Sequence, residues 1–287
     1  MKKYFIMFAA IAALMCSCTK EEVNEIVPTS DNTTVTINFL PYEMVQMKSN
    51  HHIGYYCTRL DVYITDNTTG QVYKFHKSQN NTTGNITNFS SIQLPANTNH
   101  TYTIYAVAHK GNDTITLNNE VVSFPDNNIT QTFFYNNTFQ PTYNMTFNCY
   151  MYRIVGAFRM ITRDVVPTPV RNFEFILDSV YSKWNVNGYA TNKIERVKTF
   201  NNFTRQDDST ALFTIYIMSS DTITTTTLNI TAKALTSSNE VYQERNFYDV
   251  PIKDDYLTIY EGNFFVDFNM NMGFYAHDWD TLGHYNF

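Results

Sequence analysis

Cysteine is scarce in this chain of 287 residues, and its four cysteines fall into two separate groups. Cys16 and Cys18 lie at the N-terminus, and only Cys57 and Cys149 follow them. Two isolated cysteines are too few for a disulfide framework or a zinc cluster. The sequence leaves open whether Cys57 and Cys149 form a disulfide, because it does not give the distance between their Cα atoms.

Charge is also scarce, and its sign is wrong for nucleic acid. Charged residues make up 16% of the chain, and the net charge is −6. The first 17 residues hold Lys2 and Lys3 and no acidic side chain, so the remaining chain carries −8. Nucleic acids and anionic lipid headgroups both require clustered Lys and Arg. We therefore expect no nucleic-acid partner, and membrane attachment has to come from another feature.

That feature is the N-terminus, where the apolar run is short. Lys2 and Lys3 precede the mostly apolar stretch from Tyr4 to Met15, and a small residue then precedes Cys18. A membrane-spanning helix needs about 20 apolar residues, so this stretch is too short to be one. The order of positive charge, apolar run and small residue predicts a secretory signal peptide over residues 1–17.

A cysteine directly after such a segment resembles a bacterial lipoprotein signal, in which the thiol is acylated, for example with palmitate. Cys18 is the better acceptor, because Ser17 before it is small whereas Cys16 follows the bulky Met15. Met15 stands where such signals usually carry leucine, and an ordinary cleaved signal is the alternative. We predict lipidation at Cys18.

Residues 18–33 are polar and acidic, which predicts a flexible tether. Its start, Lys20, Glu21 and Glu22, resembles signals that send some lipoproteins to the outer face of the outer membrane. A solvated tether without such a signal has the same composition. From the lipoprotein signal and this acidic start of the tether, we predict a lipid-anchored, surface-exposed protein of the cell outer membrane.

Aromatic residues are abundant, with 21 Tyr and 22 Phe, and they favour β-sheet. Val35, Ile37 and Phe39 alternate with polar residues, as in a half-buried strand. No long amphipathic helix with caps is visible, so the sequence predicts an all-β protein of antiparallel β-sandwiches. We expect strands at 35–39, 60–64, 72–75, 92–94, 102–108, 115–117, 132–135, 145–151, 153–161, 173–177, 212–218, 226–234, 241–247 and 257–268.

The strand pattern breaks at residues 136–143, around Pro141, and then restarts. We therefore predict two tandem domains, an N-terminal β-sandwich over residues 34–140 and a C-terminal β-sandwich over residues 141–287. Both are large enough to bury a core.

Three segments resemble the FimB-like fimbrillin anchor family. They are residues 58–66 with the Thr-Gly turn that follows, residues 152–158, and residues 249–265. In the third segment Asp255 replaces the usual Asn. The resemblance implies two transthyretin-like sandwiches and a structural role in fimbria assembly and cell adhesion. It further implies that the protein holds the base of a fibre at the outer membrane and binds other fimbrillin subunits by strand exchange.

Polymerising members of that family lose an N-terminal strand to an Arg-specific protease. This chain has no arginine before Arg59, so the strand at 34–39 cannot be released in that way. A retained first strand suits an anchor better than a shaft subunit.

Signatures of catalysis are missing, since no G-x-S-x-G, P-loop or H-E-x-x-H motif occurs. His51 and His52 are adjacent, and adjacent residues of a strand point to opposite faces, so the two histidines do not easily bind one metal ion together. Arg153 and Arg159 lie within apolar strands, where a paired or snorkelling arginine is expected. We predict a protein that is not an enzyme and has no metal or cofactor.

Two further surface interpretations stay open. An aromatic face including Trp184 and Trp279 would stack sugars, which gives the alternative function of a surface glycan-binding lipoprotein. The segments Asp113–Ile115, Asp178–Val180, Asp221–Ile223 and Asp280–Leu282 resemble a bacterial O-glycosylation pattern. Such short patterns also recur by chance in a Thr-rich chain.

Overall fold

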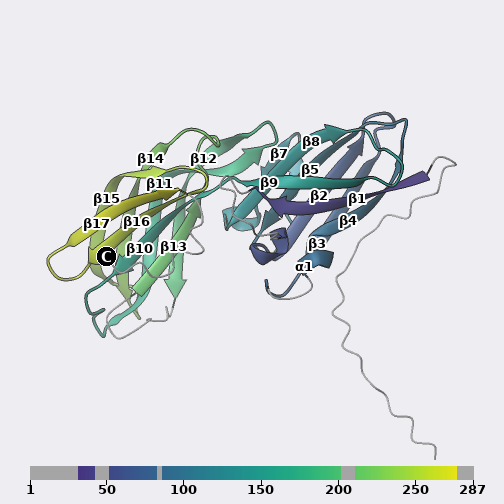
Figure 1. Cartoon of the computed structure of the whole chain (residues 1–287). Helices are drawn as coiled ribbons and strands as arrows, with labels where there is room; N and C mark the ends of the chain where they lie inside the picture. Colours follow the sequence, from purple (N-terminus) through teal and green to yellow (C-terminus); the bar gives the residue numbers. More distant parts are fainter. Residues whose placement is uncertain (1–31, 43–51, 83–85, 202–210, 277–287) are drawn as a thin grey trace, which may run out of the picture.

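The computed structural model describes residues 32–42, 52–82, 86–201 and 211–276, and nearly all of its regular structure is strand (Figure 1). The all-β prediction is confirmed. One short helix, α1 (Ile86–Phe89), and two 3-10 turns, η1 (Ile53–Tyr55) and η2 (Pro125–Asn127), are the helical elements of the described residues. None of these elements is long and apolar enough to cross a membrane.

The strands are β1 (Asn32–Pro41), β2 (Arg59–Asp66), β3 (Val72–Ser78), β4 (Ser91–Asn97), β5 (Tyr102–His109), β6 (Thr116–Asn118), β7 (Val121–Ser123), β8 (Thr132–Phe139), β9 (Thr146–Arg153), β10 (Gly156–Thr162), β11 (Val170–Asn185), β12 (Tyr189–Asn201), β13 (Ala211–Ile217), β14 (Thr226–Thr236), β15 (Val241–Ile252), β16 (Tyr256–Asn263) and β17 (Asn269–Ala276).

Seven strands form the first sheet, in the order β3-β2-β5-β8-β9-β1-β4. Two residue pairs, Phe133 with Arg153 and Phe134 with Tyr152, join β8 to β9. Together with η1 and α1, these strands enclose a first core, in which Val35, Ile37 and Phe39 of β1 are fully buried. We call this part of the molecule the N-terminal region.

The remaining long strands form what we call the C-terminal region. Its four-stranded sheet has the order β13-β10-β16-β17, and its six-stranded sheet contains β15-β14-β11-β7-β6 with β12 paired to β11. A second core of buried side chains is rich in phenylalanine. Phe173 and Phe213, for example, place their ring centroids 4.4 Å apart.

A third core joins the two regions. Strand β11 is 16 residues long, and its last residues, Lys183–Asn185, pair with β7. Trp184 lies in this core with 1% of its surface exposed, and its ring approaches Phe134 of β8 at 6.1 Å. Figure 1 accordingly shows β7 of the N-terminal half of the chain beside the end of β11 and β12.

The predicted domain boundary between residues 140 and 141 stays a prediction, and so do the two transthyretin-like sandwiches. Strand β9 follows that boundary in the sequence, yet it belongs to the first sheet through its pairing with β1. Sheet membership therefore favours a boundary after Arg153.

Several strand predictions need correction. The strand expected at 153–161 begins only at Gly156, because Arg153 is the last residue of β9. The strand expected at 257–268 ends at Asn263, and it is followed by a turn in which Asp164 accepts hydrogen bonds from the N–H groups of residues 264–266. Strands β7, β12 and β17 were not predicted.

Candidate functional site

The predicted lipidation site and export signal, Cys18, Lys20, Glu21 and Glu22, lie outside the described residues. The same holds for His51, Trp279 and the last of the four Asp-Ser/Thr segments. These predictions remain predictions. The part of the chain that bears on strand exchange is described, however, and it consists of the first strand and the outer strands of each sheet.

Strand β1 is held along both of its edges. It pairs antiparallel with β4 from Asn32 to Asn38 and parallel with β9 from Thr36 to Pro41. Beyond the ladders, the Phe39 N–H donates to Ser90 O at 2.8 Å, and the Tyr42 N–H donates to Met151 O at 2.7 Å. The slot between β4 and β9 is therefore filled by the chain's own strand.

The outer face around β1 carries exposed tyrosines. Tyr42, Tyr150 and Tyr152 are 41%, 49% and 49% exposed, and the rings of Tyr42 and Tyr152 lie 4.4 Å apart. Beside them the Asn38 side-chain amide donates to Asn148 Oδ1 at 3.1 Å. Exposed tyrosines flanked by amides are typical of a protein-binding surface.

Among the described residues, β17 is an outer strand that pairs on one side only, with β16. Outer strands present unpaired N–H and C=O groups, and proteins usually block them with charge, proline, shortness or a cover. The sequence of β17, Asn-Met-Asn-Met-Gly-Phe-Tyr-Ala, contains neither charge nor proline. Within the described part of the chain, its outer edge is therefore free to pair with a further strand.

The other outer strands of the described residues are each blocked. Strand β13 lacks charge, but Arg196 of β12 donates from Nη2 to its Tyr216 carbonyl at 2.6 Å. Strand β6 has three residues. The rest carry proline or charge: Pro95 in β4, Lys74 and Lys77 in β3, Lys193, Glu195 and Lys198 in β12, and Glu244, Arg245 and Pro251 in β15.

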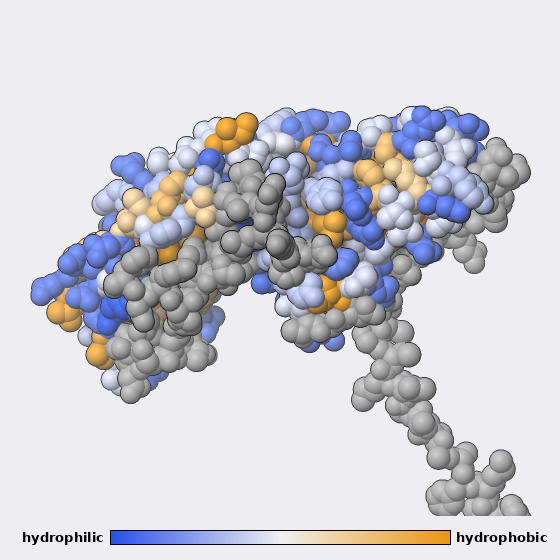
Figure 2. All heavy atoms as spheres, in the orientation of Figure 1, coloured by the Kyte–Doolittle hydropathy of each residue, from blue (hydrophilic) through white to orange (hydrophobic). Residues whose placement is uncertain are grey.

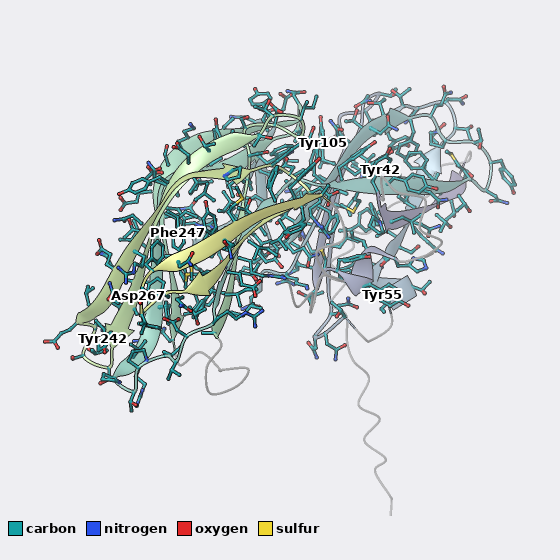
Figure 3. All side chains as sticks on the ribbon, turned by 60° about the vertical axis from the view of Figure 1, so that its left-hand side comes forward. Tyr42, Tyr55, Tyr105, Tyr242, Phe247 and Asp267 are labelled. Carbon is teal, nitrogen blue, oxygen red and sulfur yellow. The ribbon has the colours of Figure 1, made fainter. Side chains whose placement is uncertain are left out.

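Apolar side chains surround the open edge. Met272 and Phe274 of β17 are 52% and 37% exposed, and Val266 in the preceding turn is 61% exposed. Figure 2 shows orange, hydrophobic residues at the left-hand end of the molecule, where the turns of the C-terminal strands lie. Figure 3 places Asp267, which belongs to this turn, beside Tyr242 and Phe247 of β15. Arg245 fixes the turn by donating to Phe264 O at 2.9 Å.

Histidine and carboxylate side chains meet in one buried cluster. Asp61 is fully buried, its Oδ1 lies 2.8 Å from His76 Nδ1, and its Oδ2 lies 3.4 Å from His109 Nε2. The Gly111 N–H donates to His109 Nδ1, so His109 carries its hydrogen on Nε2 and donates it to Asp61. Burial raises the pKa of Asp61, but hydrogen bonds from both histidines and from the Ile115 N–H outweigh it, and the net pKa is lowered.

This cluster connects the side chains of β2, β3 and β5 and contains no nucleophile. Within the described ranges no group of three or more His, Cys, Asp or Glu side chains is arranged to hold a metal ion. His52 is half-buried at the start of η1, and the preceding residue, His51, lies outside those ranges. The geometry of the described chain thus offers a polar support and no catalytic constellation.

Asp254 is a second buried carboxylate, in the turn between β15 and β16. It is 3% exposed and accepts a hydrogen bond from the Ser219 N–H at 3.3 Å, while its Oδ2 has no partner among the described residues. Burial raises the pKa of Asp254 to about 8. Its neighbour Asp255 pairs with Arg153 at 3.0 Å, which confirms that Arg153 is a paired arginine.

Two other predictions have outcomes here. Trp184 is buried in the third core, so the expectation that it contributes to a sugar-stacking face was wrong. Cys57 and Cys149 are both buried, and they do not form a disulfide with each other. Burial raises the pKa of Cys149 far above its usual value, which keeps this thiol protonated and unreactive.

Comparisons with known proteins give no match to a protein-family model or to a curated protein. Similar solved structures include a proposed cell adhesion protein of Bacteroides ovatus, with 13% identity, 86% of this chain and 98% of that chain covered, and a TM-score of 0.47. A proposed adhesin of Bacteroides thetaiotaomicron has 10% identity, coverage of 86% and 97%, and a TM-score of 0.48. The fimbrial anchor protein Mfa2 of Porphyromonas gingivalis has 10% identity, coverage of 80% and 90%, and a TM-score of 0.42. Likenesses of this size assign neither a family nor a function.

Proposed function

We propose that this protein is a non-enzymatic lipoprotein of the outer membrane surface, of the FimB-like fimbrillin anchor type, that acts as an anchor or accessory subunit of a fimbria. The observation that supports this proposal best is the position of β1. The chain leaves the proposed anchor at Cys18, crosses a short tether and enters the fold through a strand that is bonded on both edges.

Such a strand suits an attachment that bears load. A pull on the tether acts along β1, and the ladders to β4 and β9 have to shear together before the strand comes out. Buried side chains at Val35, Ile37 and Phe39 resist the same displacement, because each would have to move its apolar surface into water. No arginine precedes Arg59, so an Arg-specific protease leaves the tether attached.

The proposed partner is another fimbrial subunit, and its site is the open edge of β17. An extended segment added there forms main-chain hydrogen bonds for affinity, while Met272 and Phe274 offer apolar contacts for register. Two tandem transthyretin-like sandwiches complete the proposal, with their boundary placed after Arg153 because β9 pairs with β1. Because Trp184 is buried, the alternative of a glycan-stacking lipoprotein loses one of its two tryptophans.

Deleting the gene and restoring it as wild type or as Cys18→Ser tests this proposal. We expect the deletion strain to shed its fibres or to carry fibres of abnormal length, as seen by electron microscopy. The Cys18→Ser protein should leave the membrane fraction as an intact chain, because the acylated thiol is its attachment.

Cys16→Ser is the matched control, since it removes the neighbouring thiol and leaves Cys18 in place. This variant should stay in the membrane fraction. Fibres of normal length that remain attached to the deletion strain would contradict the anchor function, whatever the fractionation of Cys18→Ser shows.

A further inference from the structure

A polar pocket of about 500 Å³ opens at one end of the first sheet. Three strands end there side by side, because Arg59 at the start of β2 pairs with Ser78 at the end of β3 and with His109 at the end of β5. The pocket is lined by residues of the three segments that leave these strands, namely 58–59, 78–80 and 110–112. Its volume lies within the range of about 300 to 1,000 Å³ of small-molecule sites.

The charged side chains of this lining are both cations. Arg59 belongs to β2 and Lys110 to the loop that follows β5, and the lining contains no carboxylate. Neither side chain has an ion-pair partner within the described residues, although the chain as a whole has a net charge of −6. The Arg59 guanidinium donates from Nη2 to Asn112 O, and this bond holds it at the pocket wall with further N–H donors to spare. The pocket is thus complementary to a negative charge.

The rest of the lining is suited to hydroxyl groups. Thr58 and Ser78 supply hydroxyls, and Asn80 and Asn112 supply amides, so hydrogen-bond donors and acceptors lie around the two cations. A bare inorganic anion uses only donors. A ligand that also carries hydroxyl groups pairs with the acceptors, which favours a hydroxylated anion over a simple one.

Buried hydrogen bonds also hold the pocket wall in place. Asp61 lies two residues from Arg59 on the same strand, and it binds His109 and the N–H of Ile115 on either side of the loop that contains Lys110. His109 in turn accepts the N–H of Gly111 within that loop. A buried carboxylate and histidine therefore fix the loop, and a preorganised wall loses less entropy when a ligand binds.

We propose that this pocket binds a small hydroxylated carboxylate of the sugar-acid class, with Arg59 and Lys110 on the carboxylate and the neighbouring amides on the hydroxyls. The site is separate from β1 and from the edge of β17, and it does not depend on the fimbrial role.

The test is a titration of the full chain in detergent with D-glucuronate, D-glucose and inorganic sulfate, followed by calorimetry or ligand-detected NMR. We expect glucuronate to bind at least tenfold more tightly than glucose, because only glucuronate carries the charge, and more tightly than sulfate, because only glucuronate carries hydroxyls. Equal binding of glucuronate and glucose, equal binding of sulfate and glucuronate, or no binding of glucuronate would each overturn the proposal.

Two variants and a control locate the site. Arg59→Gln and Lys110→Gln should each weaken glucuronate binding about tenfold or more, because each removes a charge-assisted hydrogen bond. Arg171→Gln is the matched control, since Arg171 also donates to main-chain carbonyls but lies in the C-terminal region. An equal loss in Arg171→Gln, or no loss in the two pocket variants, would overturn the assignment.

Lys110→Gln keeps the test decisive if Arg59→Gln folds poorly, because the exposed Lys110 side chain makes no hydrogen bond or ion pair with the described residues. Its thermal midpoint should equal that of the wild-type protein.

Discussion

The first and the last described strands, β1 and β17, occupy opposite positions in their sheets. Strand β1 is bonded on both edges and buries alternate side chains completely, whereas β17 is bonded on one edge and leaves most of its side chains exposed. Both strands are uncharged and extended, so charge does not cause the difference. The difference comes from their neighbours, and it separates a strand that holds the fold from a strand that is free to bind.

Two of the buried carboxylates, Asp61 and Asp254, show a similar contrast between the regions. Asp61 in the N-terminal region accepts hydrogen bonds from two histidines and a backbone N–H, and its net pKa is lowered. Asp254 in the C-terminal region has one oxygen without a partner among the described residues, and its pKa is raised to about 8. Burial alone therefore does not tell whether a carboxylate stabilises the fold, because the hydrogen bonds that it accepts decide the sign of its pKa shift.

The largest effect is expected from shortening a side chain in each strand. Phe39→Ala should lower the free energy of unfolding by about 3 to 5 kcal/mol, because it leaves a cavity in the first core. Phe274→Ala, at a ring that is 37% exposed, should cost about 1 kcal/mol or less. Urea unfolding monitored by circular dichroism measures both values.

The same pair of variants separates folding from binding. Phe274→Ala should weaken the retention of fibres on cells while it leaves the protein folded. If Phe39→Ala does not fold, Ile37→Val should still cost about 0.5 to 1.5 kcal/mol. Equal costs for Phe39→Ala and Phe274→Ala would show that the two strands do not differ as described.

A smaller effect is expected at Asp61. Asp61→Asn should destabilise the protein on the order of 2 to 3 kcal/mol at pH 7, because it removes the charge that both histidines pair with. The pKa of Asp61 is lowered in the folded protein, so its contribution is complete above the usual pKa of about 4 and is lost as the pH falls through the folded value. Unfolding curves between pH 2 and pH 7 measure this loss.

The control for this variant is Asp113→Asn, at an exposed aspartate, which should change stability by less than about 0.5 kcal/mol. If Asp61→Asn unfolds in acid along the same curve as the wild-type protein, the paired carboxylate is not what acid removes.

The sequence predicted the strands that follow the simple alternation and missed those that do not. The apolar residues Val35, Ile37 and Phe39 define β1, and the structure places all three in the core. Strand β12 carries Lys193, Glu195 and Lys198, and most of its side chains are exposed, so no apolar face indicated it. Its long pairing with β11 provides the stability that its own residues lack.

The sites were harder to predict, because they depend on what lies next to each strand. Alternation in β2 assigns Asp61 and Tyr63 to the solvent face, yet the structure buries both, since the third core covers that face. The pocket near Arg59 combines three segments far apart in the sequence. The open edge of β17 can be recognised only once β16 is known to be its single neighbour. In each case the residues were visible in the sequence, but their partners were not.

An effect of opposite sign, smaller than those of Phe39→Ala and Asp61→Asn, is expected at Asp254. Its raised pKa means that the folded protein holds a proton that the unfolded chain gives up above about pH 4, so this carboxylate lowers stability progressively as the pH rises from about 4 to about 8. Asp254→Asn removes that pH dependence and keeps an oxygen to accept the Ser219 N–H. We expect the free energy of unfolding to rise by about 2 kcal/mol at pH 8. The gain is smaller than the full cost of burying the charge, because the new amide N–H₂ also lacks a partner among the described residues. The thermal midpoints of the variant and the wild-type protein should coincide near pH 4 and separate toward pH 8, with the variant higher. If the midpoints stay together over this range, the pKa of Asp254 is not raised by burial, and the contrast with Asp61 is lost.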